Sequence, residues 1–127
     1  MLCDATPMGF ISVSDYDRAR AFYVDLLGLQ VFSQDDFALV LRSGSTLIRV
    51  AKPKQLIIAP YTIFGWQVTH IGDKVFGMTA QGIVFEQYDF LGDAQSAHGI
   101  WTAPSGDMVA WFKDPDGNLL SLSQHVG

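Results

Sequence analysis

The side chains in this sequence best suited to metal binding or nucleophilic chemistry are three histidines and one cysteine. His70 lies at a predicted helix start, His98 lies in a long polar stretch, and His125 lies near the C-terminus. Cys3 lies in an N-terminal stretch for which no element is predicted. No spacing brings these residues together, and none supports a Ser-His-Asp or Cys-His arrangement. The sequence therefore predicts no catalytic residue of the nucleophilic kind.

Composition narrows the classes of partner. The chain has 127 residues with 13 acidic against 8 basic side chains, a net charge of -5 that argues against nucleic acid and anionic membranes. A single cysteine excludes an intrachain disulfide and fits a reducing compartment. The longest apolar stretch, Leu56 to Trp66, contains Pro60 and is shorter than the ~20 residues that cross a bilayer. With no secretory signal visible at the N-terminus, we expect a cytoplasmic protein.

The first half of the chain has the pattern of one strand, one helix and three strands. Residues 9–13 are apolar and β-prone, and either Ser14 or Asp15 can cap the helix that follows. Apolar residues then recur at helical spacing until Gly28, which is suited to a helix end. The three further strands are predicted at residues 29–32, 37–42 and 46–51.

The second half repeats this pattern after a proline-containing connector, residues 53–60. An offset of 55 residues superposes the first strand and helix start on residues 65–70, where Thr69 is a possible cap, and the second helix is expected to end near Gly82. An offset of 72 superposes the last hairpin of each half and carries Arg49 onto Ser121. Strands are predicted at residues 83–86, 108–113 and 119–124, with a tight turn at 114–118.

Two separated groups of residues carry a family resemblance. The first is Val13-Ser14-Asp15 with Arg18-Ala19, Phe22-Tyr23 and Leu27-Gly28-Leu29; the second is the run from Trp111 to Asn118. From Phe10 to Gln124 the chain resembles the vicinal oxygen chelate superfamily, which includes glyoxalases, bleomycin-resistance proteins and extradiol dioxygenases. The resemblance implies a single α+β domain over residues 1–127, with two βαβββ modules (8–52 and 61–125). Their sheets would curl around a central cleft, with helices on the outer face.

Metal-dependent members of that family hold the metal with four side chains, one each from the first and last strand of each module. The resemblance and the two offsets place these positions at Met8, Arg49, Ile63 and Ser121. A divalent transition metal requires imidazole, carboxylate or thiolate donors, which none of the four provides, and Arg49 is a fixed cation. We therefore predict no metal and no other cofactor.

Strand alternation indicates which residues line the cleft implied by the resemblance. The predicted ligand-binding residues are Met8, Phe10, Ser12, Arg49, Ile63, Gln67, Trp101 and Ser121. The guanidinium of Arg49 would anchor an acidic or carbonyl group of a ligand, although an ordinary ion pair or a solvated position explains Arg49 equally well. Trp101 is expected at a cleft mouth or a dimer contact, and Trp111 in the core.

Three functions remain open from the sequence. The first, which we favour, is a metal-free small-molecule-binding protein whose ligand is aromatic or amphipathic, as in the drug-sequestering branch of the family. The second is a metal-dependent lyase, isomerase or dioxygenase, which the four metal positions argue against. The third is a structural or regulatory dimer with a filled cavity. The resemblance also implies a homodimer.

Overall fold

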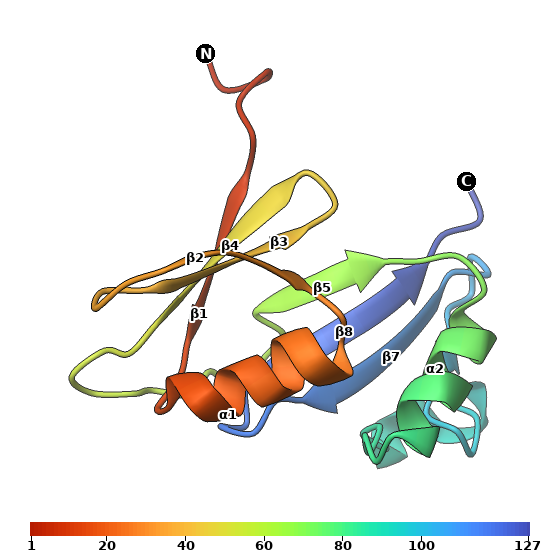
Figure 1. Ribbon diagram of the computed structural model, residues 1–127. Helices are drawn as coiled ribbons and strands as arrows, with labels where there is room; N and C mark the ends of the chain where they lie inside the picture. Colours follow the sequence, from red (N-terminus) through yellow and green to blue (C-terminus); the bar gives the residue numbers. More distant parts are fainter. The chain divides into compact units, whose positions relative to one another are not determined.

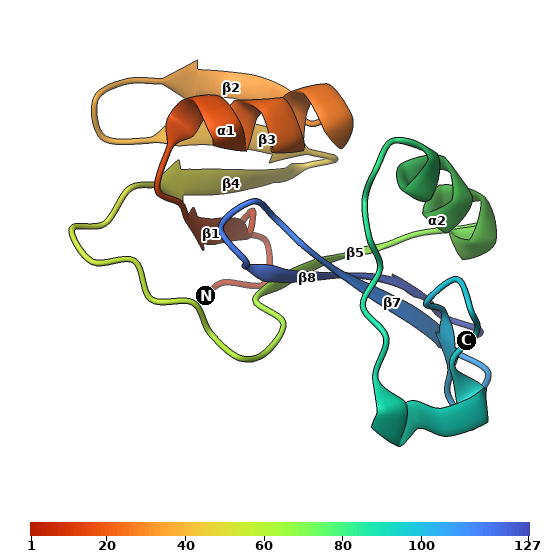
Figure 2. The same ribbon diagram turned by 90° about the horizontal axis from the view of Figure 1, so that it is seen from below.

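The computed structural model describes residues 1–127, and the chain divides into two compact units, Met1–Ile58 and Ala59–Gly127 (Figures 1 and 2). Each unit holds a four-stranded mixed sheet with a helical segment between its first strand and the strands that follow. No helix is both long and apolar enough to cross a membrane. The α+β fold with two βαβββ-like modules is therefore confirmed.

The first unit has the sheet order β1-β4-β3-β2, with β1 parallel to β4 and the other pairs antiparallel. Its elements are β1 (Met8–Ser12), α1 (Tyr16–Arg20), the π-helix η1 (Ala21–Leu26), β2 (Gln30–Gln34), β3 (Leu39–Ser43) and β4 (Thr46–Ala51). Asp15 caps the helix by accepting a hydrogen bond from the Arg18 N–H at 2.9 Å. The helix lies along one face of the sheet (Figures 1 and 2) and contributes buried Phe22 and Tyr23 to the core.

The second unit has the corresponding order β5-β8-β7-β6, with β5 parallel to β8. Its elements are β5 (Phe64–Gln67), α2 (Ile71–Ala80), the 3-10 segment η2 (Asp89–Ala94), β6 (Trp101–Thr102), β7 (Met108–Lys113) and β8 (Leu119–Gln124). Ile71 and Val75 are the buried residues of α2. The turn between β7 and β8 is held by buried Asp114, whose carboxylate accepts hydrogen bonds from the backbone and side chain of Asn118.

Strand pairing confirms the internal repeat. In the first unit Phe10 lies opposite Arg49, and in the second unit Gly65 lies opposite Ser121, so offsets of 55 and 72 relate the two pairs. The offset of 72 does not hold for the strands before these, β3 and β7. Val40 pairs with Arg49 and Trp111 pairs with Ser121, so β3 and β7 are related by an offset of 71. The longer turn before β8 accounts for the extra residue.

Two local predictions for the second unit are wrong. Residues 83–86 form no strand beyond an isolated bridge between Phe85 and Phe112, and the outer strand is the short β6 instead. The first residue of α2 is preceded by His70 in a left-handed conformation (φ 53°) with no side-chain cap, in place of the expected Thr69 cap. The N–H of Ile71 instead donates to the Gln124 side-chain oxygen at 2.8 Å, which ties α2 to β8.

Candidate functional site

The first unit places four of the predicted ligand-binding residues on one face of its sheet. Met8, Phe10 and Ser12 are exposed and alternate along β1 with the buried Ile11, as strand geometry requires. Phe10, with 67% of its surface exposed, lies opposite Arg49, so the two side chains share the face that does not carry the core.

Arg49 is half-buried, and its side chain makes no hydrogen bond or ion pair within the chain. The charged group that it influences is Asp35, in the turn between β2 and β3. Hydrogen bonds from the N–H groups of Phe37 and Ala38 hold the pKa of Asp35 below its ordinary value, and the Arg49 charge adds a smaller effect in the same direction. Arg49 therefore has an acidic neighbour without a direct contact, which leaves its guanidinium donors available.

The sheet of the second unit has one face that carries the core and another that we call the open face. Buried Ala110, Phe112, Leu120 and Leu122 point to the core. The alternate residues define the open face: Gly65, Gln67, Val109, Trp111, Leu119, Ser121 and Ser123. Gly65 has a steric role there, because a Cβ at this position would collide with the Ser121 side chain and backbone. Predicted site residues Gln67, Ser121 and Trp101 belong to this side of the unit, and half-buried Ile63 precedes β5.

Four aromatic side chains gather at the open face, and we call them the aromatic cluster: Tyr88, Phe90, Trp101 and Trp111. The ring of Trp111 lies 6.0 Å from that of Trp101 and 5.4 Å from that of Tyr88, measured between centroids. Phe90 extends the cluster from Tyr88, at 5.6 Å, and is 84% exposed. The expectation that Trp111 packs in the core is wrong, because its strand parity places it opposite Ser121 on the open face.

The backbone around the aromatic cluster is fixed by one amide side chain. Gln95 accepts a hydrogen bond from the Tyr88 N–H at 2.8 Å and donates to the carbonyl oxygens of Glu86 and Gly99. Burial and the nearby Glu86 carboxylate raise the pKa of Tyr88 above its ordinary value, with a smaller opposing effect from Lys113. The Tyr88 phenol is therefore a neutral hydrogen-bonding group at physiological pH.

The residues at the family's metal positions do not fit a divalent metal. A thioether, a guanidinium, an aliphatic chain and a hydroxyl occupy them, at Met8, Arg49, Ile63 and Ser121 respectively. Elsewhere in the chain no three histidine, cysteine, aspartate or glutamate side chains lie close enough to hold a metal together.

The largest departure from the sequence-based expectations concerns the contacts of His125. His125 contacts both Ser123 and Asp107, side-chain neighbours that no spacing in the sequence indicated. The three residues lie at one end of the β7–β8 hairpin. Its last pair is Met108 with Gln124, so the next two positions, Asp107 and His125, lie opposite one another; the hairpin register was therefore the signal that could have found them. His98 is separate, with its ring 4.8 Å from that of Phe76.

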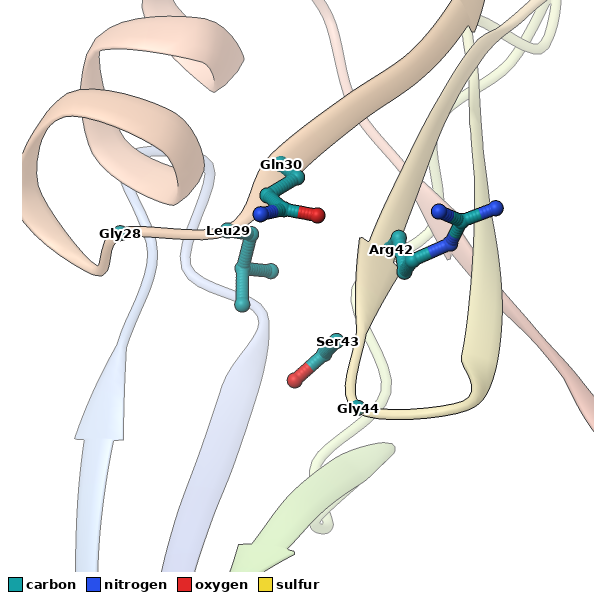
Figure 3. Close-up of a pocket in the computed structure, with 6 residues that line it drawn as sticks. All are labelled: Gly28, Leu29, Gln30, Arg42, Ser43 and Gly44. Carbon is teal, nitrogen blue, oxygen red and sulfur yellow. The ribbon is translucent and has the colours of Figure 1, made fainter.

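A shallow hollow in the first unit, about 360 Å³ in volume, lies between the end of the helix and the β3–β4 turn (Figure 3). Its lining is Gly28, Leu29, Gln30, Arg42, Ser43 and Gly44. Figure 3 shows the Arg42 guanidinium directed away from the Ser43 hydroxyl, and it lies over the Phe32 ring at 4.9 Å. The cation is thus engaged outside the hollow, which makes this place a weaker candidate than the open face.

The fold is that of a two-module vicinal oxygen chelate protein, and the sequence agrees. Residues 7–122 match the family described as Glyoxalase/Bleomycin resistance protein/Dioxygenase superfamily, so the chain belongs to that superfamily. The family resemblance predicted from the two groups of residues is confirmed. None of the curated proteins matches the sequence.

Solved structures share the fold at low sequence identity. A glyoxalase family protein from Enterococcus faecalis is 23% identical, with 97% of this chain and 99% of that chain covered and a TM-score of 0.76. A lactoylglutathione lyase from Agrobacterium tumefaciens is 16% identical, with 95% and 93% covered and a TM-score of 0.75. A glyoxalase/bleomycin resistance protein/dioxygenase from Alicyclobacillus acidocaldarius is 17% identical, with 98% and 93% covered and a TM-score of 0.72. At these identities the likeness concerns the fold alone.

The purified, untagged protein is expected to retain no stoichiometric zinc, iron, nickel or manganese, because the four family positions lack suitable donors. Elemental analysis, together with calorimetric titration of each metal, measures this directly. One equivalent of tightly bound metal per chain would contradict the prediction.

Proposed function

We propose that this protein binds a small aromatic or amphipathic molecule without a metal, and that the open face of the second unit holds the aromatic part. The observation that carries the proposal is the aromatic cluster, in which Tyr88 joins half-buried Trp111 and Trp101 to the highly exposed Phe90. Contiguous exposed aromatic surface mostly marks a binding site rather than a structural need. The metal-dependent alternative would need a group of donor side chains, and no three histidine, cysteine, aspartate or glutamate side chains lie together.

The open face also supplies the polar groups that orient a ligand. Ser121 brings a hydroxyl to β8, the strand beside Trp111, and Gln67 brings an amide to β5, the next strand of the same face. The Tyr88 phenol adds a neutral donor and acceptor. Apolar stacking surface combined with a few fixed polar groups is the usual composition of a small-molecule site.

Trp101→Ala is expected to weaken binding of 2-naphthol roughly tenfold, equivalent to about 1.4 kcal/mol, because one stacking surface is lost. Binding is measured by calorimetric titration in the presence of EDTA. Phe37→Ala is the matched control, since Phe37 is 77% exposed but belongs to the first unit. Equal effects of the two substitutions, or none from Trp101→Ala, would contradict a site on the open face.

We also propose that Arg49 binds an anionic ligand on the sheet face of the first unit, separately from the open face of the second unit. Arg49→Ala is then expected to weaken binding of 2-naphthoate by about 1.5–3 kcal/mol, the usual contribution of a hydrogen bond to a charged group. Binding of the uncharged 2-naphthol serves as the control and should change little. If Arg49 instead stabilises the Asp35 carboxylate, the substitution lowers the melting temperature and leaves 2-naphthoate binding unchanged. That result would refute the anchoring role.

We further propose that the protein is a homodimer and is located in the cytoplasm. The exposed, unpaired Cys3 suits a reducing compartment. Pairing of two chains is proposed from the family, in which small two-module proteins commonly form twofold dimers. Light scattering that gave the 14.0 kDa mass of one chain at micromolar concentration would contradict it.

A further inference from the structure

Three side chains at one end of the second unit form a connected hydrogen-bonded row. Ser123 Oγ lies 3.1 Å from His125 Nε2, and His125 Nδ1 lies 3.2 Å from Asp107 Oδ2. The two contacts use the two different ring nitrogens of the histidine. A hydroxyl, an imidazole and a carboxylate connected in this order are the arrangement that activates serine nucleophiles.

The β7–β8 register produces this row. Met108 pairs with Gln124 as the last antiparallel pair of the hairpin, so the next positions outward, Asp107 and His125, lie opposite one another. Ser123 precedes His125 by two residues, and side chains two apart on a strand point to the same face. All three residues therefore continue the open face, on the same side as Trp111.

The carboxylate is held in place by the backbone. Asp107 Oδ1 accepts a hydrogen bond from the Val126 N–H at 2.9 Å, which leaves Oδ2 directed to the histidine. These bonds, with Val126 first and His125 second, lower the pKa of Asp107 below its ordinary value. An ionised carboxylate beside Nδ1 favours the tautomer with hydrogen on Nδ1, so that the lone pair of Nε2 faces the Ser123 hydroxyl.

We propose that Ser123, His125 and Asp107 form a nucleophilic site that hydrolyses carboxylic esters of aromatic alcohols. In the first step the Ser123 Oγ–carbonyl carbon bond forms, the bond from that carbon to the alcohol oxygen breaks, and the serine proton passes through His125 Nε2 to the departing oxygen. In the second step water attacks the acyl carbon, one water proton passes through Nε2 to Ser123 Oγ, and the carboxylic acid leaves. This activity goes beyond ligand binding.

The surroundings of Ser123 indicate the substrate class. Trp111 lies diagonally across the β7–β8 pair from Ser123, a relation that corresponds to about 7–8 Å between residues. An aryl group on the Trp111 ring would therefore bring an attached ester toward Ser123 Oγ. The aromatic half of the ester is accordingly expected to be the alcohol, lying on the aromatic cluster.

Gln67 is the candidate donor to the developing oxyanion. It pairs with Ser123 across the parallel β5–β8 strands and lines an open hollow of about 510 Å³ together with Val68, Thr69 and Lys74. A carboxamide N–H beside the nucleophile can stabilise a tetrahedral oxyanion. The side chains of His125 and Asp107 are 44% and 32% exposed, so solvent weakens the electrostatics and turnover is expected to be slow.

The test uses the full-length protein and 2-naphthyl acetate, whose hydrolysis releases fluorescent 2-naphthol. Ser123→Ala and Asp107→Asn are each expected to reduce the protein-dependent rate ~100-fold, the scale of a lost acid–base partner. Ser33→Ala and His98→Gln are matched controls, because Ser33 is an exposed strand serine in the first unit and His98 is an exposed histidine outside the row. Both controls should retain the wild-type rate. Circular dichroism verifies that each variant is folded.

An alkyl fluorophosphonate provides a second measurement that does not depend on turnover. The Ser123 Oγ–phosphorus bond should form as fluoride leaves with the serine proton, giving a mass increase on the peptide that contains residue 123. Labelling that is absent, or that persists in Ser123→Ala, would overturn the proposal. So would a 2-naphthyl acetate rate that survives Ser123→Ala but is lost in His125→Gln, since the imidazole alone would then be the nucleophile.

Failure of hydrolysis is distinguishable from failure of the binding function. Calorimetric titration of 2-naphthol into the wild type reports binding alone, because 2-naphthol has no ester bond to hydrolyse. Normal binding with no serine labelling overturns the esterase site alone, and the row would then serve only to fix the C-terminal residues through Asp107. If the wild type does not bind 2-naphthol, the proposed binding function is overturned instead.

Discussion

Gly99→Ala is expected to lower the free energy of unfolding by about 2–5 kcal/mol. Gly99 has a φ of 98°, where a non-glycine residue costs about 1–2 kcal/mol. Its added Cβ would also lie 2.7 Å from the Phe85 Cβ, and relieving such overpacking costs typically about 1–3 kcal/mol. Urea denaturation of the wild type and the variant measures the sum of the two effects.

Gly82→Ala is the control for this substitution. Gly82 has the same φ of 98°, but its Cβ would meet no atom within 4 Å. Gly82→Ala should therefore show the backbone cost alone, and the difference between the variants measures the contact with Phe85. Because Gln95 also bonds to Gly99, Gly99→Ala should weaken 2-naphthol binding as well. Equal destabilisation by the two substitutions would contradict the close packing of Gly99 on Phe85.

Phe112→Ala should mainly reduce stability and Trp111→Ala should mainly reduce 2-naphthol binding, although the two residues are adjacent on β7. Phe112 is fully buried, with its ring stacked on that of Trp66 at 6.4 Å, and its loss should cost about 3–5 kcal/mol of stability. Trp111 is half-buried on the open face, so its loss should destabilise the protein clearly less and impair 2-naphthol binding more.

Urea denaturation and calorimetric titration of both variants test this contrast. The comparison is internal, since each substitution removes one large aromatic ring from the same strand. A larger loss of stability from Trp111→Ala than from Phe112→Ala would reverse the assignment of the two faces. The assignment of the aromatic cluster to the open face would then be wrong as well.

The sequence determined the fold well because its signals are local and repeated. The helix cap at Asp15, the glycine after the first helix and the turn at residues 114–118 each fix an element boundary by backbone chemistry. The offset of 55 then carried Phe10 to Gly65, and the observed strand pairs reproduce it. A pattern repeated in two halves constrains the register more than either half alone.

The parts that were missed depend on contacts between segments that are distant in the sequence. Residues 83–86 are apolar and β-prone, yet a two-residue strand at Trp101 occupies the sheet edge in their place. Asp107 is 18 residues from His125, and their contact follows only from the exact pairing of β7 with β8. Strand parity alone would have placed Trp111 beside Ser121, but its size and apolar character favoured a core assignment.

The most direct test of a metal-free aromatic site uses the three tryptophans of the chain as reporters. In an EDTA-treated, ¹⁵N-labelled protein, each indole N–H gives one NMR signal, which a Trp→Phe variant assigns. Addition of 2-naphthol should shift the signals of Trp101 and Trp111, and leave that of Trp66, which stacks on buried Phe112, unchanged. A shift of the Trp66 signal alone, or no shift of any of the three signals, would contradict the account.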